Sequence, residues 1–261
     1  MKAGLARDEP VPPIFLHMAL ARDVRDRLTA IPEEHVGAYY LGATSPDIRV
    51  LTRWERARTH FFDLNVLEHQ DSVAAMFAQH PELADPAQLN PETVAFVVGY
   101  IGHLALDEEW IEQVYRPHFG QASALGGDAR ANVMDRVLQY ELERRRREDP
   151  ELSAEIRAAL ERCSLAIHVG FLDSATLRRW QEVAIDITRH PPTWDRFRVI
   201  GSRHLKGAGI EREEDMAAFI ERIPEVLEQT IRHVSTAHVD AYLERSKERA
   251  VAVAERYLGK R

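Results

Sequence analysis

The sequence predicts an all-α protein, and three observations carry that prediction. Apolar residues recur every three or four positions through most of the 261 residues, as they do on the buried faces of helices. The alternation of apolar and polar residues that marks half-buried strands is missing, and proline and glycine fall between the periodic segments. No internal repeat or low-complexity linker divides the chain. We therefore expect a multi-helix single domain over residues 1–261, with an N-terminal half of about 10–120 and a helical extension of about 125–261.

Proline and glycine delimit the helices of the N-terminal half. Pro32 fits the first turn of one helix and Gly42 ends it, because proline lacks an N–H that a first turn leaves unpaired. Pro46 disfavours helix at the residue before it, and Pro117 stops a long helix that begins near residue 90. The segments expected here are a helix over 14–28, a helix over 35–41, a loop over 42–47, a mixed segment over 54–64, a helix over 67–79 and a long helix from 90–92 to 117.

The second half is more charged and is also predicted to be helical. Helices are expected over residues 130–147, 151–163, 174–190, 193–202 and 213–257. Residues 144–147 are consecutive arginines, which we interpret as the solvated end of the first of these helices. Pro224 predicts a break in the last helix, since an interior proline removes a helix hydrogen bond.

Composition and charge narrow the function classes. The formal net charge of −8 argues against a generally cationic binder of nucleic acid or membrane surfaces, so no stable nucleic-acid partner is expected. The single cysteine, Cys163, excludes an internal disulfide framework and a thiolate-rich zinc site. The chain has 12 histidines, which leaves imidazole and carboxylate as the available metal ligands.

The N terminus does not resemble a signal peptide. Asp8 and Glu9 stand where positive charge is expected, and His17 interrupts the apolar run of residues 12–21. No stretch approaches the roughly 18–20 apolar residues that a membrane span requires. These features predict a cytoplasmic protein without a transmembrane segment. The oligomeric state does not follow from the sequence.

The most informative stretch is residues 99–110, which reads as the middle of an apolar helix. His103 and Asp107 lie four residues apart in it, so both side chains share one face of the helix. Their neighbours are apolar, which predicts that the pair points into the core; these neighbours are Val97, Val98, Ile101, Leu104 and Leu106. A buried imidazole and carboxylate are costly unless something pairs with them, and a metal ion satisfies both.

Three more residues complete a candidate metal site, and each has an ordinary interpretation when taken alone. His17 lies among apolar residues of the first predicted helix, as a core histidine would. Asp47 follows a proline in a predicted loop, where aspartates often cap a turn, and His60 precedes two phenylalanines. Together with His103 and Asp107 they offer three imidazoles and two carboxylates, a set that suits zinc, iron or manganese.

Four segments carry a resemblance to a known family. They are His17 to Ala21, Tyr40 to Asp47, Arg58 to Phe61 and Gly99 to Asp107, and they give the order His, Pro-Asp, His-Phe, His-x3-Asp over roughly the first 120 residues. This order resembles the zinc-dependent phospholipase C family, which is related to the fungal single-strand-specific zinc nucleases. The resemblance implies an all-helical fold of that type, with additional C-terminal helices, and hydrolysis of phosphodiester bonds at a zinc cluster.

The resemblance also implies a ligand set. His60, His103 and Asp47 would hold one metal ion, His17 would hold a second, and Asp107 would bridge the two. Residues 10–120 would then be the half that carries the metal site. We expect one or two zinc ions per chain, with iron or manganese as alternatives.

The sequence departs from the family pattern at two places. Secreted members use a processed N-terminal tryptophan as a ligand, whereas this chain begins with Met1, sixteen residues before His17. Members also carry a histidine soon after the bridging aspartate and then a helical His-x3-Glu or His-x3-Asp, and neither occurs here. The remaining candidates to complete a metal shell are His118, His168, His204, His233 and His238.

These observations predict a metal-dependent hydrolase that acts on a phosphoester through a metal-bound hydroxide. The substrate is expected to be a phospholipid, a nucleotide or a small phosphodiester. Asp47 is the expected catalytic residue, either as a ligand or as the base for the attacking water, and Arg58 is the arginine expected to meet the phosphate. Two alternatives stay open: a non-haem iron or manganese redox enzyme, and a helical binding protein with a structural metal.

Overall fold

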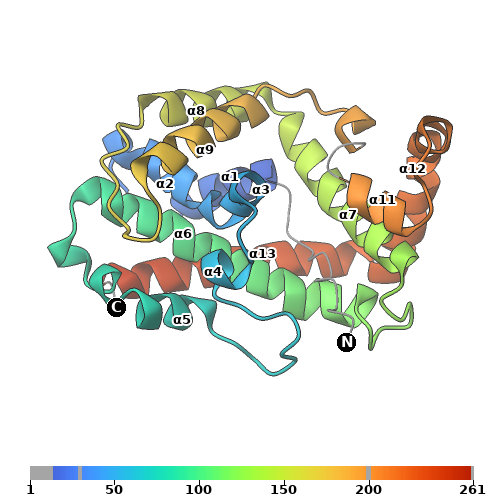
Figure 1. The fold of residues 1–261 in the computed structure, drawn as a ribbon, viewed down its shortest axis with the longest axis horizontal. Coiled ribbons are helices and arrows are strands. Elements are labelled where there is room, and N and C mark those ends of the chain that lie inside the picture. Colours follow the sequence, from blue (N-terminus) through green and yellow to red (C-terminus); the bar gives the residue numbers. More distant parts are fainter. Residues whose placement is uncertain (1–13, 29–30, 198–200, 260–261) are drawn as a thin grey trace.

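The computed structural model describes residues 14–28, 31–197 and 201–259, and within these ranges the chain forms helices and no strands (Figure 1). The all-α prediction is therefore confirmed for the described residues. Residues 1–13, on which the interpretation of the N terminus depends, lie outside them, as do residues 198–200 of the predicted helix over 193–202. Among the helices described, none combines the length and the apolar character that crossing a bilayer requires.

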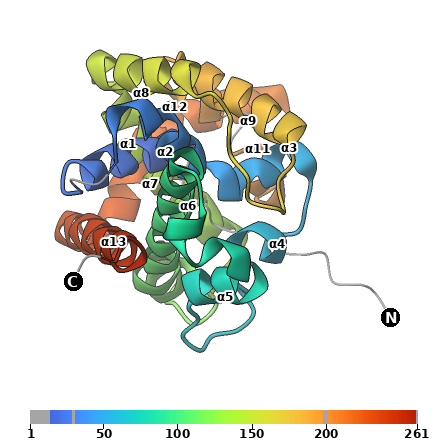
Figure 2. The ribbon, with the colours of Figure 1, turned by 90° about the vertical axis from the view of Figure 1, so that its left-hand side faces the viewer.

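The helix α6 (Pro91–Trp110) lies at the centre of the fold, between α2 (Val36–Gly42) and α13 (Thr236–Tyr257) (Figures 1 and 2). Two glycines allow α2 and α6 to touch backbone to backbone. A Cβ atom on Gly99 would lie 2.0 Å from the carbonyl oxygen of Tyr39, and one on Gly42 would lie 2.0 Å from that of Phe96. This close approach brings the segment after Gly42 against the middle of α6.

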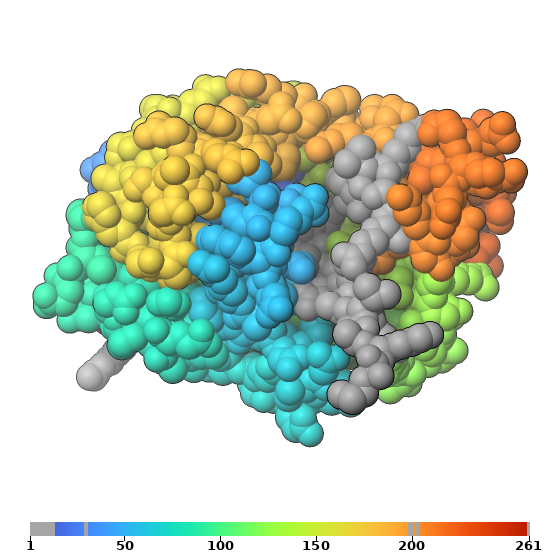
Figure 3. All heavy atoms as spheres, viewed as in Figure 1, coloured from blue at the N-terminus to red at the C-terminus, as the bar shows by residue number. Residues whose placement is uncertain are grey.

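The remaining helices surround this centre. They are α1 (Ile14–Arg25), η1 (Glu33–His35), η2 (Ser45–Ile48), α3 (Arg49–Thr52), α4 (Ala57–His60), α5 (Ser72–Gln79), η3 (Pro81–Leu83), η4 (Pro86–Gln88), η5 (Ile111–Phe119), α7 (Ala129–Arg147), α8 (Pro150–Arg162), α9 (Ser174–Ile187), η6 (Trp194–Arg196), α11 (Ser202–Gly207) and α12 (Glu213–Val234). Figure 3 shows α3 and α4, in light blue, at the surface between the yellow segment of α9 and the orange segment of α11 and α12.

One apolar core joins the two halves of the chain. Its buried residues run from Phe15 to Tyr257, and a smaller cluster between α7, α11 and α12 includes Val137, Phe197 and Ile223. Because α13 packs along α6, the C-terminal extension completes the core of the N-terminal half. The molecule is therefore one domain.

The structure corrects three predictions made from proline. Pro46 lies in the first turn of the 3-10 helix η2, where its missing N–H leaves no bond unmade, so residues 45–48 are not a loop. Pro117 lies inside the π-helix η5, which extends the long helix to Phe119. Pro224 lies inside a continuous α12, and the chain breaks instead at Ser235, whose φ is 70°.

Two further boundaries differ from expectation. The helix predicted over 67–79 begins at Ser72, because the Asp71 side chain caps it by accepting a hydrogen bond from the Ala74 amide at 2.8 Å. Arg147 is not solvated: it is 4% exposed, pairs with Glu143 at 2.9 Å and donates to the Ile187 carbonyl oxygen. An arginine run thus ends in a buried ion pair.

Candidate metal centre

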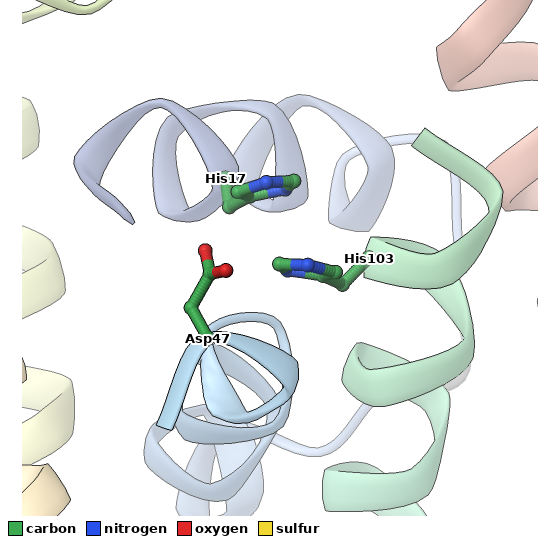
Figure 4. Close-up of side chains that lie close together, drawn as sticks. All are labelled: His17, Asp47 and His103. Atoms are coloured by element: carbon green, nitrogen blue, oxygen red, sulfur yellow. The ribbon is translucent and has the colours of Figure 1, made fainter. Parts of the chain in front are cut away.

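The structure brings together all five residues of the predicted metal site. His17 comes from α1, Asp47 from η2, His60 from the end of α4, and His103 and Asp107 from α6. All five are buried, with at most 3% of each residue exposed. Figure 4 shows His17, Asp47 and His103 from three separate segments pointing toward one another. Their convergence is a structural fact, while their role as ligands stays a prediction.

Local hydrogen bonds hold the η2 and α4 segments in place. The hydroxyl groups of Thr44 and Ser45 both donate to the Leu41 carbonyl oxygen, at 3.0 and 2.7 Å, which ties η2 to the end of α2. On the other side, the Tyr100 hydroxyl of α6 donates to the Thr59 carbonyl oxygen at 2.5 Å. These bonds fix the residues before Asp47 against the end of α2, and the residue before His60 against α6.

The distances between imidazole nitrogens and carboxylate oxygens suit a shared cation. Asp107 Oδ1 lies 3.3 Å from His17 Nε2, and Asp107 Oδ2 lies 3.3 Å from His60 Nε2 and 3.6 Å from His103 Nε2. Asp47 Oδ1 lies 3.5 Å from His60 Nε2. Two ligands at about 2.0–2.1 Å from a tetrahedral zinc ion are about 3.4 Å apart. The observed spacings therefore match edges of a coordination shell.

Neighbouring groups orient two of the rings. His103 Nδ1 lies 2.8 Å from the Ala43 carbonyl oxygen, to which it donates, so Nε2 carries the lone pair whenever the ring is neutral. His60 Nδ1 contacts the Thr59 hydroxyl oxygen at 3.1 Å. Both rings therefore direct Nε2 toward the carboxylates, in the manner of metal-ligating histidines whose other nitrogen is hydrogen-bonded.

Most of the atoms that face one another here have no hydrogen-bond partner among the described residues. These atoms are both ring nitrogens of His17, Nε2 of His60, Nε2 of His103, Oδ2 of Asp47 and Oδ1 of Asp107. An unsatisfied buried polar group costs about 1–3 kcal/mol, so a ligand that pairs with several of these atoms at once would be strongly stabilising. A divalent cation would satisfy lone pairs of both kinds, and the residues present therefore fit a metal ion.

Ring orientation decides which histidines can share an ion. His17 and His103 are stacked, with ring centroids 3.7 Å apart and planes only 19° from parallel. The lone pair of an imidazole lies in its ring plane, so two stacked rings do not direct their lone pairs to one point. His60 and His103 are 5.4 Å apart with planes at 64°, which allows both to face one ion. His17 instead faces the other oxygen of Asp107.

The electrostatics keep both carboxylates ionised. Burial would raise the pKa of Asp107, but the charges of His103 and Arg56 hold it well below its ordinary value. Burial likewise opposes ionisation of Asp47, yet contact with His60 and the charge of His103 lower its pKa. Metal binding needs deprotonated carboxylates, and the site has them before any ion arrives.

The three histidines of the centre differ in the direction in which their pKa is shifted. Burial lowers the pKa of His17, and the neighbouring His103 lowers it further. Burial and the charge of Arg56 also lower the pKa of His60. Burial would lower the pKa of His103 as well, but the Asp107 carboxylate outweighs it and the pKa is raised. His17 and His60 are thus neutral imidazoles, the form that binds metal.

The structure buries an arginine at the centre that was not among the predicted site residues. Arg56 is 4% exposed, and its Nη2 donates to Asp107 Oδ2 at 2.7 Å. Arg58, the residue predicted to bind substrate, is exposed and its guanidinium stacks over the Trp54 ring at 3.6 Å; its contact with a phosphate stays a prediction. Arg56 precedes His60 by four residues, and that spacing was the available signal.

The other candidate ligands lie in different settings. Three of them form a separate cluster around His118. The ring centroid of His238 lies 4.8 Å from that of His118, and the ring centroid of His233 lies 5.6 Å from it. His204 Nε2 accepts a hydrogen bond from Arg136 Nε at 3.1 Å, and His168 is exposed. The structure therefore gives no support for any of these five as a ligand beside His60 and His103.

Comparisons with known proteins found no match: no family model, curated protein or solved structure matches the chain. The zinc-dependent phospholipase C relationship accordingly remains a resemblance carried by the four sequence segments.

Proposed function

We propose that this protein is a metal-dependent hydrolase of phosphoesters, with zinc as the expected ion. The observation that carries the proposal is the buried set of three imidazoles and two carboxylates whose facing atoms lack partners among the described residues. The order of these residues in the chain, which resembles that of zinc-dependent phospholipases C, supports phosphoester chemistry over other reactions of such a centre.

Four residues would hold the ion: Asp47, His60, His103 and Asp107. When bound, the ion supplies a coordinated water of lowered pKa and polarises a phosphoryl oxygen. Asp47 fits the catalytic role because its two carboxylate oxygens have different surroundings. Oδ1 faces His60 at 3.5 Å, whereas the buried Oδ2 has no partner in the described part of the chain and is placed to accept a proton.

The centre is buried, whereas α3 and α4 reach the surface of the molecule (Figure 3). His60 is 1% exposed, while Arg58 of the same short helix is exposed. A substrate phosphate would therefore have to reach a buried centre, and the Arg58 guanidinium would meet it at the surface. A phospholipid headgroup, a nucleotide or a small phosphodiester meets that requirement.

The test is Asp47→Asn, which keeps the side-chain size and removes its charge and basicity. Turnover of bis-p-nitrophenyl phosphate should fall by about 10²–10⁴-fold, with the helical spectrum and most of the bound metal retained. Asp26→Asn, at an exposed aspartate that pairs with Arg22 of α1, is the matched control and should leave turnover unchanged.

Parallel assays on lipid, nucleotide and simple ester substrates complete the experiment. If the wild-type protein loaded with zinc, manganese or iron hydrolyses none of them, the hydrolase proposal fails. Oxygen consumption by the iron- or manganese-loaded protein would then identify the redox alternative, and a metal shell without an exchangeable water would identify a structural ion.

A further inference from the structure

A buried arginine shares the central carboxylate with the histidines. Arg56 and Asp107 are both 3% exposed at their side chains, and Arg56 Nη2 donates to Asp107 Oδ2 at 2.7 Å. The His60 amide donates to the Arg56 carbonyl oxygen at 2.8 Å, so one helical turn carries both side chains to Asp107. The guanidinium is therefore a fixed part of the centre.

This contact limits how many cations the centre can take. Asp107 Oδ2 already receives the guanidinium and faces His60 and His103, which leaves Asp107 Oδ1, Asp47 Oδ2 and His17 for any second ion. His17, Asp47 and His103 do gather within 4.8 Å of one another, but the stacked rings of His17 and His103 cannot both direct lone pairs to one ion.

The charges of the buried side chains also favour a single ion. Asp47 and Asp107 bring two negative charges, and Arg56 already offsets one of them inside the buried cluster. One divalent ion would then leave a net charge of about +1, and two would leave about +3. Uncompensated charge in a low-dielectric interior is strongly unfavourable. Among these three residues, one divalent ion beside the arginine therefore leaves much less uncompensated charge than two.

We propose that the centre holds a single divalent ion, bound by Asp47, His60, His103 and Asp107, and that Arg56 takes the position of a second ion on Asp107. His17 is then not a ligand but a positioning residue, because it contacts Asp107 Oδ1 and stacks on His103. The inference rests on the metal centre of the proposed function and goes beyond it in metal count and in the roles of Arg56 and His17.

The metal count of the wild-type protein and two histidine variants tests it. Apo protein titrated with Co²⁺ should saturate its visible absorbance at one equivalent. His17→Gln should still bind one equivalent, while His60→Gln should lose the spectrum. Two equivalents in the wild type, falling to one in His17→Gln, would overturn the proposal.

Substitutions of Arg56 test its role separately. Arg56→Gln removes the positive charge and should allow a second equivalent of Co²⁺ to bind, whereas Arg56→Lys keeps the charge and should stay at one. Arg58→Gln, at the exposed arginine two residues away, is the matched control and should also stay at one. A count that remains one in folded Arg56→Gln contradicts the role given to Arg56.

If Arg56→Gln does not fold by circular dichroism, the wild-type and His17→Gln counts decide the inference. No substrate enters these titrations, so their result is distinct from that of the hydrolase test. A protein that binds one ion and hydrolyses nothing would retain this inference and lose the proposed function.

Discussion

Two groups of three histidines differ in one respect that matters for function. In the centre, Nε2 of His17, His60 and His103 faces carboxylates and has no hydrogen-bond partner among the described residues. In the second group, His233 Nε2 donates to the His118 carbonyl oxygen at 2.8 Å and His238 Nε2 donates to the Gln113 carbonyl oxygen at 2.7 Å. The second group is also partly exposed.

The difference shows that close imidazoles alone do not make a metal site. In this group, Nε2 of His233 and Nε2 of His238 donate to backbone oxygens, and no carboxylate of the described residues contacts a ring. The centre combines burial, ligand atoms without partners among the described residues and ionised carboxylates, so a cation would satisfy its polar atoms. Four predictions follow from this contrast, ordered by expected effect.

The largest effect is expected from paired substitutions in the two groups. His60→Ala/His103→Ala removes two ligands and should abolish measurable metal binding in equilibrium dialysis. His118→Ala/His238→Ala removes as many imidazoles from the second group and should retain the wild-type metal content. Metal retained in the first double variant, or lost in the second, would reverse the assignment of the two groups.

Chelation should lower thermal stability, because an ion that binds only the folded state stabilises it. At a free ion concentration of about 1,000 times Kd this contribution is about 4 kcal/mol, or about 8–16 °C in Tm at about 2–4 °C per kcal/mol. The core from Phe15 to Tyr257 is apolar, so far-ultraviolet circular dichroism should show the helices persisting.

The two double variants serve as controls for this measurement. His118→Ala/His238→Ala should show the same drop in Tm on chelation, and His60→Ala/His103→Ala should show none. Complete loss of helical signal in the chelated wild type would mean that the ion organises the whole fold.

A third buried carboxylate, Asp135 of α7, differs from those of the centre because protein donors satisfy it. It accepts hydrogen bonds from Trp110 Nε1 at 3.1 Å and Gln139 Nε2 at 2.8 Å, and burial raises its pKa to about 6. The fold therefore favours protonated Asp135. Its contribution to stability is complete below the ordinary pKa of 3.8 and is lost as the pH rises through about 6.

Asp135→Asn removes this titration. Between about pH 4 and pH 7.5, wild type loses the stability that protonated Asp135 contributes, and the variant does not. The free energy of unfolding of the variant minus that of wild type should therefore rise by up to about 3 kcal/mol over this range, at about 1.36 kcal/mol per pKa unit. Urea denaturation at several pH values measures the shift. A difference that does not change with pH would contradict the pKa given to Asp135.

The smallest effect is expected from Thr59, whose hydroxyl group orients the ring of the proposed ligand His60. Thr59→Val removes the hydroxyl that contacts His60 Nδ1 at 3.1 Å and should weaken metal binding by about 10–100-fold, as loss of such contacts does elsewhere. Thr52→Val is the matched control, since the Thr52 hydroxyl donates to the Ile48 carbonyl oxygen instead. Equal metal affinity of the two variants would show that Thr59 does not orient the ring.

The central helix was predictable because its signals are local. Asn90 caps α6 by accepting a hydrogen bond from the Thr93 amide at 2.9 Å, and Pro91 occupies its first turn. The i, i+4 spacing of His103 and Asp107 then places both on one face whatever surrounds the helix. The three other site residues were found through their types and order, which the structure brings together.

Features that depend on tertiary packing were not predictable. The spacing of Arg56 and His60 places both on one face of a helical turn, but the sequence does not show that this face, and not the one with Arg58, points toward Asp107. The continuity of α12 through Pro224 rests on packing of its buried face, including Ile223, against the smaller core cluster. The packing of α13 on α6 joins segments more than one hundred residues apart, beyond the reach of periodicity.

The central claim is that the buried cluster of histidines and aspartates, and not the second histidine group, binds the metal. The most direct measurement is anomalous X-ray diffraction at the zinc absorption edge from crystals grown with zinc. The account predicts an anomalous peak among Asp47, His60, His103 and Asp107. Zinc at His118, His233 and His238, with no peak between the two aspartates, would contradict it.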